Sequence, residues 1–426
     1  MRIKPKHIRT GSIYFLTIMI FICLSVFYRL PLSTDDWHWG LWIKQGNKLP
    51  IFDEYFFRLP VCKLIFSQIF PILIQNPILG KLTVWGIAIA GFFLILSWFF
   101  KKYGINPILL PIVSLLAFFA PNQFELNFLL SSMPFCFGFI FAGLGFYFNR
   151  KNLGALGAFF YLLSFFSLEC FIVLAVLLEF LVHIETFRKR HFLKKIIGSL
   201  APAILSYIFI RLTLHFIQPY KYETGRFFSL SQFRGFIIQC FLIDFYKLNT
   251  ILSFFQLIFY GVLIYIWTSG KNAQEKRNRI ISLLAIFLII IAISSYYYFL
   301  GYAARRALAG QIAFVWATYL VFISAYLARM RKSVFVKTLI FLVLISTQIV
   351  NHARIYLVKQ YNYLQIEKEV ALLKKKLSEE DRKIEIDLRA IRANFKRDWI
   401  FASDKDVEIM LEFRLSPEEY KRIIIE

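Results

Sequence analysis

The sequence predicts an all-α polytopic membrane protein, with about eleven transmembrane helices and a small α/β tail outside the cytoplasm. Hydrophobic residues make up 58% of the 426-residue chain, and the mean hydropathy is +0.61, whereas soluble domains are about 45–50% apolar. The apolar excess falls in runs near the ~20 residues that cross a bilayer as a helix. Between these runs, Lys and Arg gather in short clusters, as in the cytoplasmic loops of membrane proteins.

The first apolar run, residues 12–30, follows a basic N-terminus. No small-residue cleavage site follows the run, so we expect an uncleaved first span with the N-terminus in the cytoplasm. The remaining spans are expected at 81–100, 106–120, 127–148, 154–167, 169–184, 196–217, 250–268, 280–299, 308–328 and 335–351. Residues 1–351 would form the membrane domain, and residues 352–426 a soluble tail.

The segment 154–183 is long for one span and short for two, and the charge pattern decides between these alternatives. If the segment is a hairpin, every basic cluster falls on the cytoplasmic side, whereas a single span would invert everything after it. The clusters are Lys101–Lys102, Arg150–Lys151, Arg188 to Lys195, Lys271 to Arg279 and Arg329 to Lys337. The hairpin therefore predicts that Glu169 lies at the outer surface.

The first outer loop, residues 32–80, is long and contains a Pro-interrupted apolar stretch, 64–79, that we expect to lie along the membrane interface. With eleven spans, the tail also lies outside. Its residues Tyr363, Ile366, Val370, Leu373 and Leu377 repeat at helical spacing. Residues 384–388 alternate as in a strand, 407–415 are a second strand candidate, and Ser416 begins a helix as its N-cap.

The net charge of +24 does not predict nucleic-acid binding, because the basic residues lie beside apolar runs, where they contact anionic lipid headgroups. The five cysteines are isolated, without metal-ligand spacing. No Gly-rich phosphate loop, Walker sequence or nucleotide-sugar domain is found in the sequence. We therefore expect no cofactor; a divalent cation at Asp35 and Asp36 is an alternative that we do not favour.

The most informative motif follows the first span, where Asp35 and Asp36 precede Trp37, His38 and Trp39. Ionised carboxylates at a membrane edge are costly unless they face water or a cavity. The motif is either the solvated start of a loop or part of a functional site. We favour the site, because tandem acids between interfacial Trp residues are unusual.

An acidic pair at the outer end of the first span of a many-span chain resembles the GT-C superfamily of membrane glycosyltransferases, in particular bacterial multispan families with Asp-Asp-aromatic in that loop. The position of the motif, the topology and Glu169 at an outer hairpin tip agree with this resemblance. It implies a GT-C-like fold in which Asp35 or Asp36 is the general base for an attacking acceptor hydroxyl. It also implies a polyprenyl-phosphate-linked sugar as donor, inversion by single displacement, and an envelope glycan or teichoic-acid-like acceptor.

The leaving lipid phosphate needs positive charge, and Arg305 and Arg306 suit this role because they occupy an outer turn. The alternative for both is anchoring to lipid headgroups. Arg226 and His38 are weaker candidates for substrate binding, and His38 is equally explained as an interfacial residue. Trp37 is expected either to stack on a sugar face or to anchor the chain at the membrane interface, and Glu169 either orients substrate hydroxyls or caps the hairpin.

Three rival functions stay open. A transporter or flippase for lipid-linked glycans predicts charges near mid-span and related halves. A glycan polymerase or ligase would share the lipid-linked substrate. A non-enzymatic assembly protein predicts that changes at Asp35 and Asp36 leave the glycan unaltered.

Overall fold

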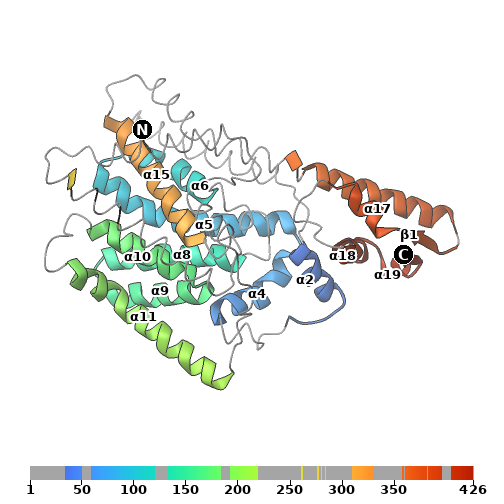
Figure 1. Cartoon of the computed structure of the whole chain (residues 1–426), viewed down its shortest axis with the longest axis horizontal. Helices are drawn as coiled ribbons and strands as arrows, with labels where there is room; N and C mark the ends of the chain where they lie inside the picture. Colours follow the sequence, from blue (N-terminus) through green and yellow to red (C-terminus); the bar gives the residue numbers. More distant parts are fainter. Residues whose placement is uncertain are drawn as a thin grey trace, which may run out of the picture.

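The computed structural model describes residues 34–49, 59–119, 133–183, 192–218, 309–329, 360–380, 382–395 and 404–425, with a few isolated positions besides. This part of the chain is predominantly helical. Figure 1 shows a bundle of long helices at one end, the tail at the other, and two short helices between them. The order along the long axis is therefore bundle, short helices, tail.

The bundle helices agree with the expected spans. They are α5 (Pro77–Tyr103), η1 (Pro107–Leu109), α6 (Leu110–Phe118), α8 (Met133–Arg150), α9 (Gly154–Ser167), α10 (Cys170–His183), α11 (Phe192–Ile217) and α15 (Ala309–Arg329). Two of the described helices, Pro77–Tyr103 and Leu193–Ile217, are long and apolar enough to cross a membrane. The spans expected at 12–30, 250–268, 280–299 and 335–351 lie outside the described residues.

Helices α5 and α8 form the centre of the bundle, and glycine allows them to meet. A Cβ on Gly143 would lie 2.5 Å from the carbonyl oxygen of Gly91. Beside this crossing, the rings of Phe92 and Phe139 lie 4.8 Å apart between centroids. Buried aromatic rings of this kind account for much of the apolar area that holds the bundle together.

The segment 154–183 forms two helices, as the charge pattern predicts. Helices α9 and α10 are joined at Leu168, whose extended backbone ends α9, and at Glu169. Helix α9 packs against α8, and the hydroxyl of Ser164 donates to the carbonyl of Gly138 at 2.9 Å. The hairpin is therefore an integral part of the bundle.

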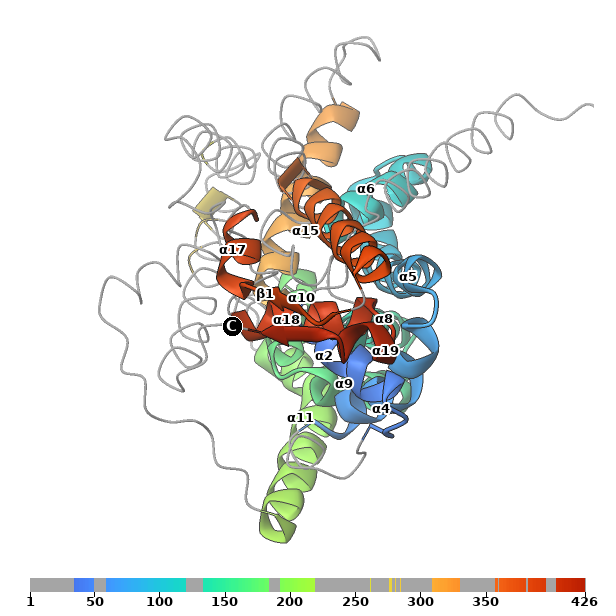
Figure 2. The ribbon, with the colours of Figure 1, turned by 90° about the vertical axis from the view of Figure 1, so that its right-hand side faces the viewer.

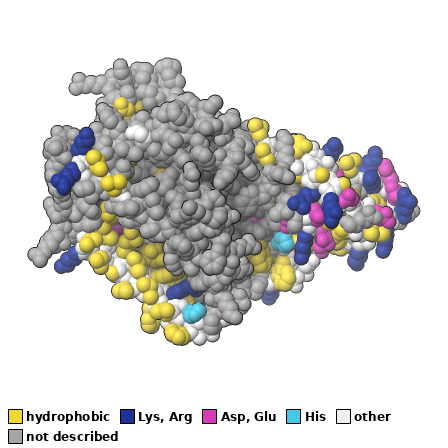
Figure 3. Space-filling model, viewed as in Figure 1, with side chains coloured by type: hydrophobic (Ala, Val, Ile, Leu, Met, Phe, Trp, Pro, Cys, Tyr) yellow, Lys and Arg dark blue, Asp and Glu magenta, His cyan; other side chains and the backbone are white. Residues whose placement is uncertain are grey.

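Basic residues gather at the end of the bundle away from the tail. Lys102 at the end of α5 donates to the carbonyl of Val182 at the end of α10, at 3.3 Å. Arg150, at the end of α8, is paired with Glu179 of α10. In Figure 3 Lys and Arg side chains lie at the left end, beside hydrophobic side chains that continue along the lower edge of the bundle, and side chains of both charges lie on the tail at the right.

At the opposite end, α4 (Pro60–Leu73) packs against α8 and α9, and α2 (Thr34–Lys44) packs on α4. The rings of Trp39 and Phe66 meet edge to face, with centroids 5.4 Å apart. The stretch 64–79 is thus helix α4, with Pro71 inside it, followed by the first turn of α5, where Asn76 is the N-cap.

The tail combines helices with a two-stranded parallel sheet. A helix over 360–379 buries Ile366, Val370, Leu373 and Leu377, which confirms the predicted helical face. It is followed by β1 (Ile384–Ile386), α17 (Leu388–Ala393), α18 (Asp404–Arg414), α19 (Pro417–Tyr420) and β2 (Ile423–Ile425). Strand β1 pairs with β2 in the register Ile384 to Ile423.

One prediction for the tail was wrong. Residues 407–415 form most of α18 and are not a strand, because Val407, Met410 and Leu411 are buried at the spacing of one helical face. The second strand is β2, at the end of the chain. The predicted start of α19 is confirmed, with a complete capping box between Ser416 and Glu419.

Candidate functional site

The acidic pair lies in a helix. Residues Asp35 and Asp36 are in the first turn of α2, and the side chain of Asp35 lies outside the described part of the structure. Asp36 is 0% exposed, and Trp37 beside it is also buried. Because no water reaches Asp36 in this arrangement, its carboxylate is an enclosed group and does not belong to a solvated loop.

Helix α2 contacts α4 through aromatic and cationic side chains. The amine of Lys63 lies 5.7 Å from the centre of the Trp39 ring, and Lys63 is itself buried. On the same side, a Cβ on Gly40 would lie 3.5 Å from Ile74. A buried ammonium group on an aromatic face is a stabilising arrangement, and it places positive charge next to the acidic helix.

The opposite face of α2 is covered by the tail. Helix α18 lies over α2, as Figure 2 shows with the tail toward the viewer. His38 Nε2 is 3.5 Å from Asp406 Oδ1. At the other end of α2, Lys44 donates to the carbonyls of Phe413 and Leu415 at 2.9 and 2.8 Å. His38, predicted as a substrate-binding residue, therefore has a partner within the protein.

Glu169 lies between α9 and α10, with one carboxylate oxygen, Oε2, enclosed by protein. The backbone of the next residue, Cys170, lies directly against Gly310 near the start of α15. Helix α4 packs against α9, so Glu169 and α4 belong to the same end of the bundle as α2. Arg226, Arg305 and Arg306 lie outside the described residues.

Two lysines at this end were missed from the sequence. Lys63 in α4 and Lys81 in the first part of α5 are both buried. They lie at the end of the bundle that the charge pattern predicts to face outward, where the positive-inside rule does not explain cations. Lys63 and Lys81 share this feature with Arg305 and Arg306, so the sequence indicated them as phosphate-binding candidates on the same ground.

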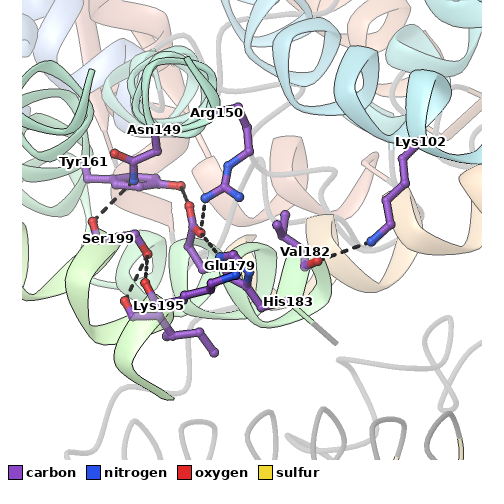
Figure 4. Close-up of polar contacts among 10 residues, drawn as sticks. Lys102, Asn149, Arg150, Tyr161, Glu179, Val182, His183, Lys195 and Ser199 are labelled. Carbon is purple, nitrogen blue, oxygen red and sulfur yellow. Dashed lines mark hydrogen bonds and ion pairs between the residues drawn. The ribbon is translucent and has the colours of Figure 1, made fainter. Parts of the chain in front are cut away.

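A second polar centre lies at the basic end of the bundle (Figure 4). Glu179 in α10 is fully buried; it is paired with Arg150, and it accepts a hydrogen bond from Tyr161 Oη at 3.3 Å. His183 Nε2 is 3.8 Å from the same carboxylate. The signal in the sequence was a single acid within the apolar run 170–183. Its partners come from three helices, so the centre ties α8, α9 and α10 together.

Among the described residues, no three His, Cys, Asp or Glu side chains are grouped so that they could hold a metal ion. The cysteines in this part of the chain, Cys62, Cys136 and Cys170, are free thiols. Comparison with family models, with curated proteins and with solved structures finds no match to this chain.

Proposed function

We propose that this chain is a polytopic membrane glycosyltransferase that transfers a sugar from a polyprenyl phosphate to an envelope glycan or teichoic-acid-like acceptor on the outer face of the membrane. The observation that carries the proposal is the enclosure of the acidic helix α2 between α4 and the tail, with buried Lys63 beside it. A solvated loop would leave Asp36 in water.

The arrangement of charge supports the proposed orientation. The ends of α5, α8 and α10 that carry Lys102, Arg150 and His183 lie together, opposite α2 and the tail. By the positive-inside rule the basic end faces the cytoplasm. The acidic helix and the tail then face outward, where a lipid-linked donor and an envelope acceptor would meet.

The proposed reaction is a single displacement at the anomeric carbon. Asp35 takes the proton of the acceptor hydroxyl as its oxygen forms the new glycosidic bond. The bond between the anomeric carbon and the phosphate oxygen breaks, and the electron pair leaves with the polyprenyl phosphate. We assign the proton transfer to Asp35 because Asp36 is fully enclosed, and we assign Asp36 the role of fixing the start of α2.

The leaving phosphate gains negative charge as the bond breaks, so cations beside it lower the barrier. We assign this role to Arg305 and Arg306, together with Lys63, whose amine lies 5.7 Å from the centre of the Trp39 ring of α2. Gly310, four residues after Arg306, contacts the residue that follows Glu169. This contact supports a site that joins the hairpin tip to the turn before α15, with Glu169 binding substrate hydroxyls.

In the test, the native gene is replaced by one that encodes Asp35→Asn, Asp36→Asn or both changes. The amount of protein in the membrane is matched between the strains. Sugars released from purified envelope by acid hydrolysis are then measured. We expect one sugar substituent to be lost with Asp35→Asn. Glu385→Gln, at an exposed position of β1, is the matched carboxylate control and should leave the glycan unchanged. An unchanged glycan in the double variant would contradict the assignment of this acidic pair as the source of the general base.

One observation favours a second candidate, a transporter or flippase for lipid-linked glycans. Glu179, which is fully buried, pairs with the partly buried Arg150 at the basic end of the bundle, and ionisable groups within membrane helices often mark transport pathways. A transporter predicts that Glu179→Gln causes lipid-linked sugar to accumulate at the cytoplasmic face, while Asp35→Asn has no effect. A glycosyltransferase predicts, by contrast, that Asp35→Asn abolishes incorporation of the sugar.

A further inference from the structure

The contact between the tail and α2 extends from the middle of that helix to its end. His38 meets Asp406 at the start of α18. Lys44 in the last turn of α2 meets the end of α18, and just beyond it Gln45 donates to Glu412 Oε1 at 3.0 Å. Contacts at two separate places fix the register and direction of the two helices, which a single contact would not achieve.

At two places the surfaces of α2 and α18 are closely complementary. The amine of Lys44 binds the last carbonyl groups of α18, where the helix dipole favours a cation. Gly40 lies under the ring of Phe413, so close that an added Cβ would be 2.9 Å from Phe413 Cε2. A larger side chain at position 40 would push the ring, and α18 with it, away from α2.

Helix α18 is in turn held firmly within the tail. Arg392 of α17 pairs with Asp404 at 3.0 Å, at the start of α18. Arg414, at its end, is paired with Glu367 of the helix over 360–379. Val407, Met410 and Leu411 are buried. The face that α18 presents to α2 is therefore set by the fold of the whole tail.

We propose that the tail is a positioning unit for the acidic helix, and that Lys44 and Gly40 are positioning residues. Docking of α18 fixes α2 over α4, and with it the location of Asp35 and Asp36 relative to the lipid-linked donor. This inference rests on the proposed function. It adds that the tail acts through α2, without itself touching the reacting atoms.

The experiment uses the full chain in cells, with the envelope sugars measured after acid hydrolysis. Lys44→Met removes the ammonium group but keeps much of the side-chain length, Lys44→Arg keeps the charge and donors, and Lys48→Met changes a nearby exposed lysine as the control. Docking is followed independently by the cross-link that a short bifunctional thiol reagent forms between Gln45→Cys and Glu412→Cys. Gln45 Nε2 and Glu412 Oε1 are 3.0 Å apart, so the two shorter cysteines face each other across a gap that such a reagent spans.

We expect Lys44→Met to reduce sugar incorporation by up to about 100-fold, the order produced by a ~1 Å displacement of a catalytic group. Lys44→Arg should restore most of the loss, and Lys48→Met should have no effect. When Lys44→Met is combined with the cysteine pair, the bifunctional thiol reagent should restore incorporation, because the cross-link replaces the lost contact. Restoration by a covalent link would not occur if Lys44 bound the substrate.

Full incorporation in Lys44→Met, with cross-linking abolished, would overturn the inference while the proposed function stands. Loss that the cross-link does not relieve would also overturn it. If the double variant Asp35→Asn with Asp36→Asn leaves the glycan unchanged, the proposed function fails. The cross-linking assay would then still report whether the tail is docked on α2.

Discussion

Gly143 of α8 lies against the backbone of Gly91 of α5, so that an added Cβ would be 2.5 Å from the Gly91 carbonyl oxygen. At this point two helix backbones are in direct contact, with no side chain between them. Such crossings are common where small residues let membrane helices approach closely. A methyl group here must push the helices apart.

We therefore expect Gly143→Ala to destabilise the bundle by about 1–3 kcal/mol, the usual cost of overpacking. Gly86→Ala is the matched control in α5, because an added Cβ there meets nothing within 4 Å. The midpoint of thermal unfolding in detergent should fall for Gly143→Ala and stay level or rise for Gly86→Ala. Equal midpoints for the two variants would contradict the close crossing.

The pair formed by Arg150 and Glu179 makes a second prediction. Removal of Arg150 leaves the buried Glu179 with only the Tyr161 hydroxyl and His183 as partners, so we expect Arg150→Met to cost up to about 3–5 kcal/mol. The double change Arg150→Met with Glu179→Met should cost less than Arg150→Met alone. Lys151→Met, at the exposed neighbouring lysine, is the control. Strictly additive losses in the double variant would show that the two groups are not coupled.

Tyr420 makes a third prediction. Burial, together with the carboxylates of Glu408 and Glu412, raises the pKa of Tyr420 to about 12. An unfolded tyrosine ionises near pH ~10, so the folded state keeps the phenol proton to a higher pH than the unfolded state does. The resulting stabilisation of the folded state is complete below pH ~10 and is lost as the pH rises toward about 12. The absorbance titration of the native chain, minus that of Tyr420→Phe, should show a midpoint near 12, and a midpoint near 10 would contradict it.

The proposed orientation makes a fourth prediction. A membrane-impermeant maleimide should label Lys376→Cys, on the exposed side of the tail helix over 360–379, in intact cells. Lys101→Cys, at the exposed basic end of α5, should react only after the cells are permeabilised. The unsubstituted chain gives the background from native cysteines. Labelling of both variants from outside would refute the orientation.

Much of the helical layout could be predicted from the sequence, since apolar runs and basic clusters together determine it. The division of 154–183 into α9 and α10 came from charge alone, and the contacts of Arg150 and Lys102 with α10 show why this worked. Lys102 and Arg150 each mark a helix end, and both ends meet α10 on one side of the bundle.

The error at 407–415 has a local cause. Val407, Ile409, Leu411, Phe413 and Leu415 alternate as in a strand, while Val407, Met410 and Leu411 also follow a helical face. Asp404 and Asp406 in the first turn favour the helix through its dipole, and this signal was not used.

The surroundings of the acidic pair could be predicted only in part. The sequence indicated a site at Asp35 and Asp36 but expected a loop, whereas the pair lies in α2. The packing of the tail on α2 could not be predicted from the sequence, because Lys44 and Phe413, which are in contact, are 369 residues apart in the chain. No local pattern reports a contact of that kind.

The length of the α9–α10 hairpin has a consequence for the membrane around it. Each helix has 14 residues and so rises about 21 Å, less than the ~30 Å hydrocarbon thickness. In the proposed orientation, the basic ends of both helices lie at the cytoplasmic boundary. The turn at Glu169 would then lie about 9 Å below the outer boundary, so the bilayer would have to thin or water would have to enter above it. Such a recess would admit the end of a glycan chain more readily than its middle, so the proposed transferase should add sugars at chain termini.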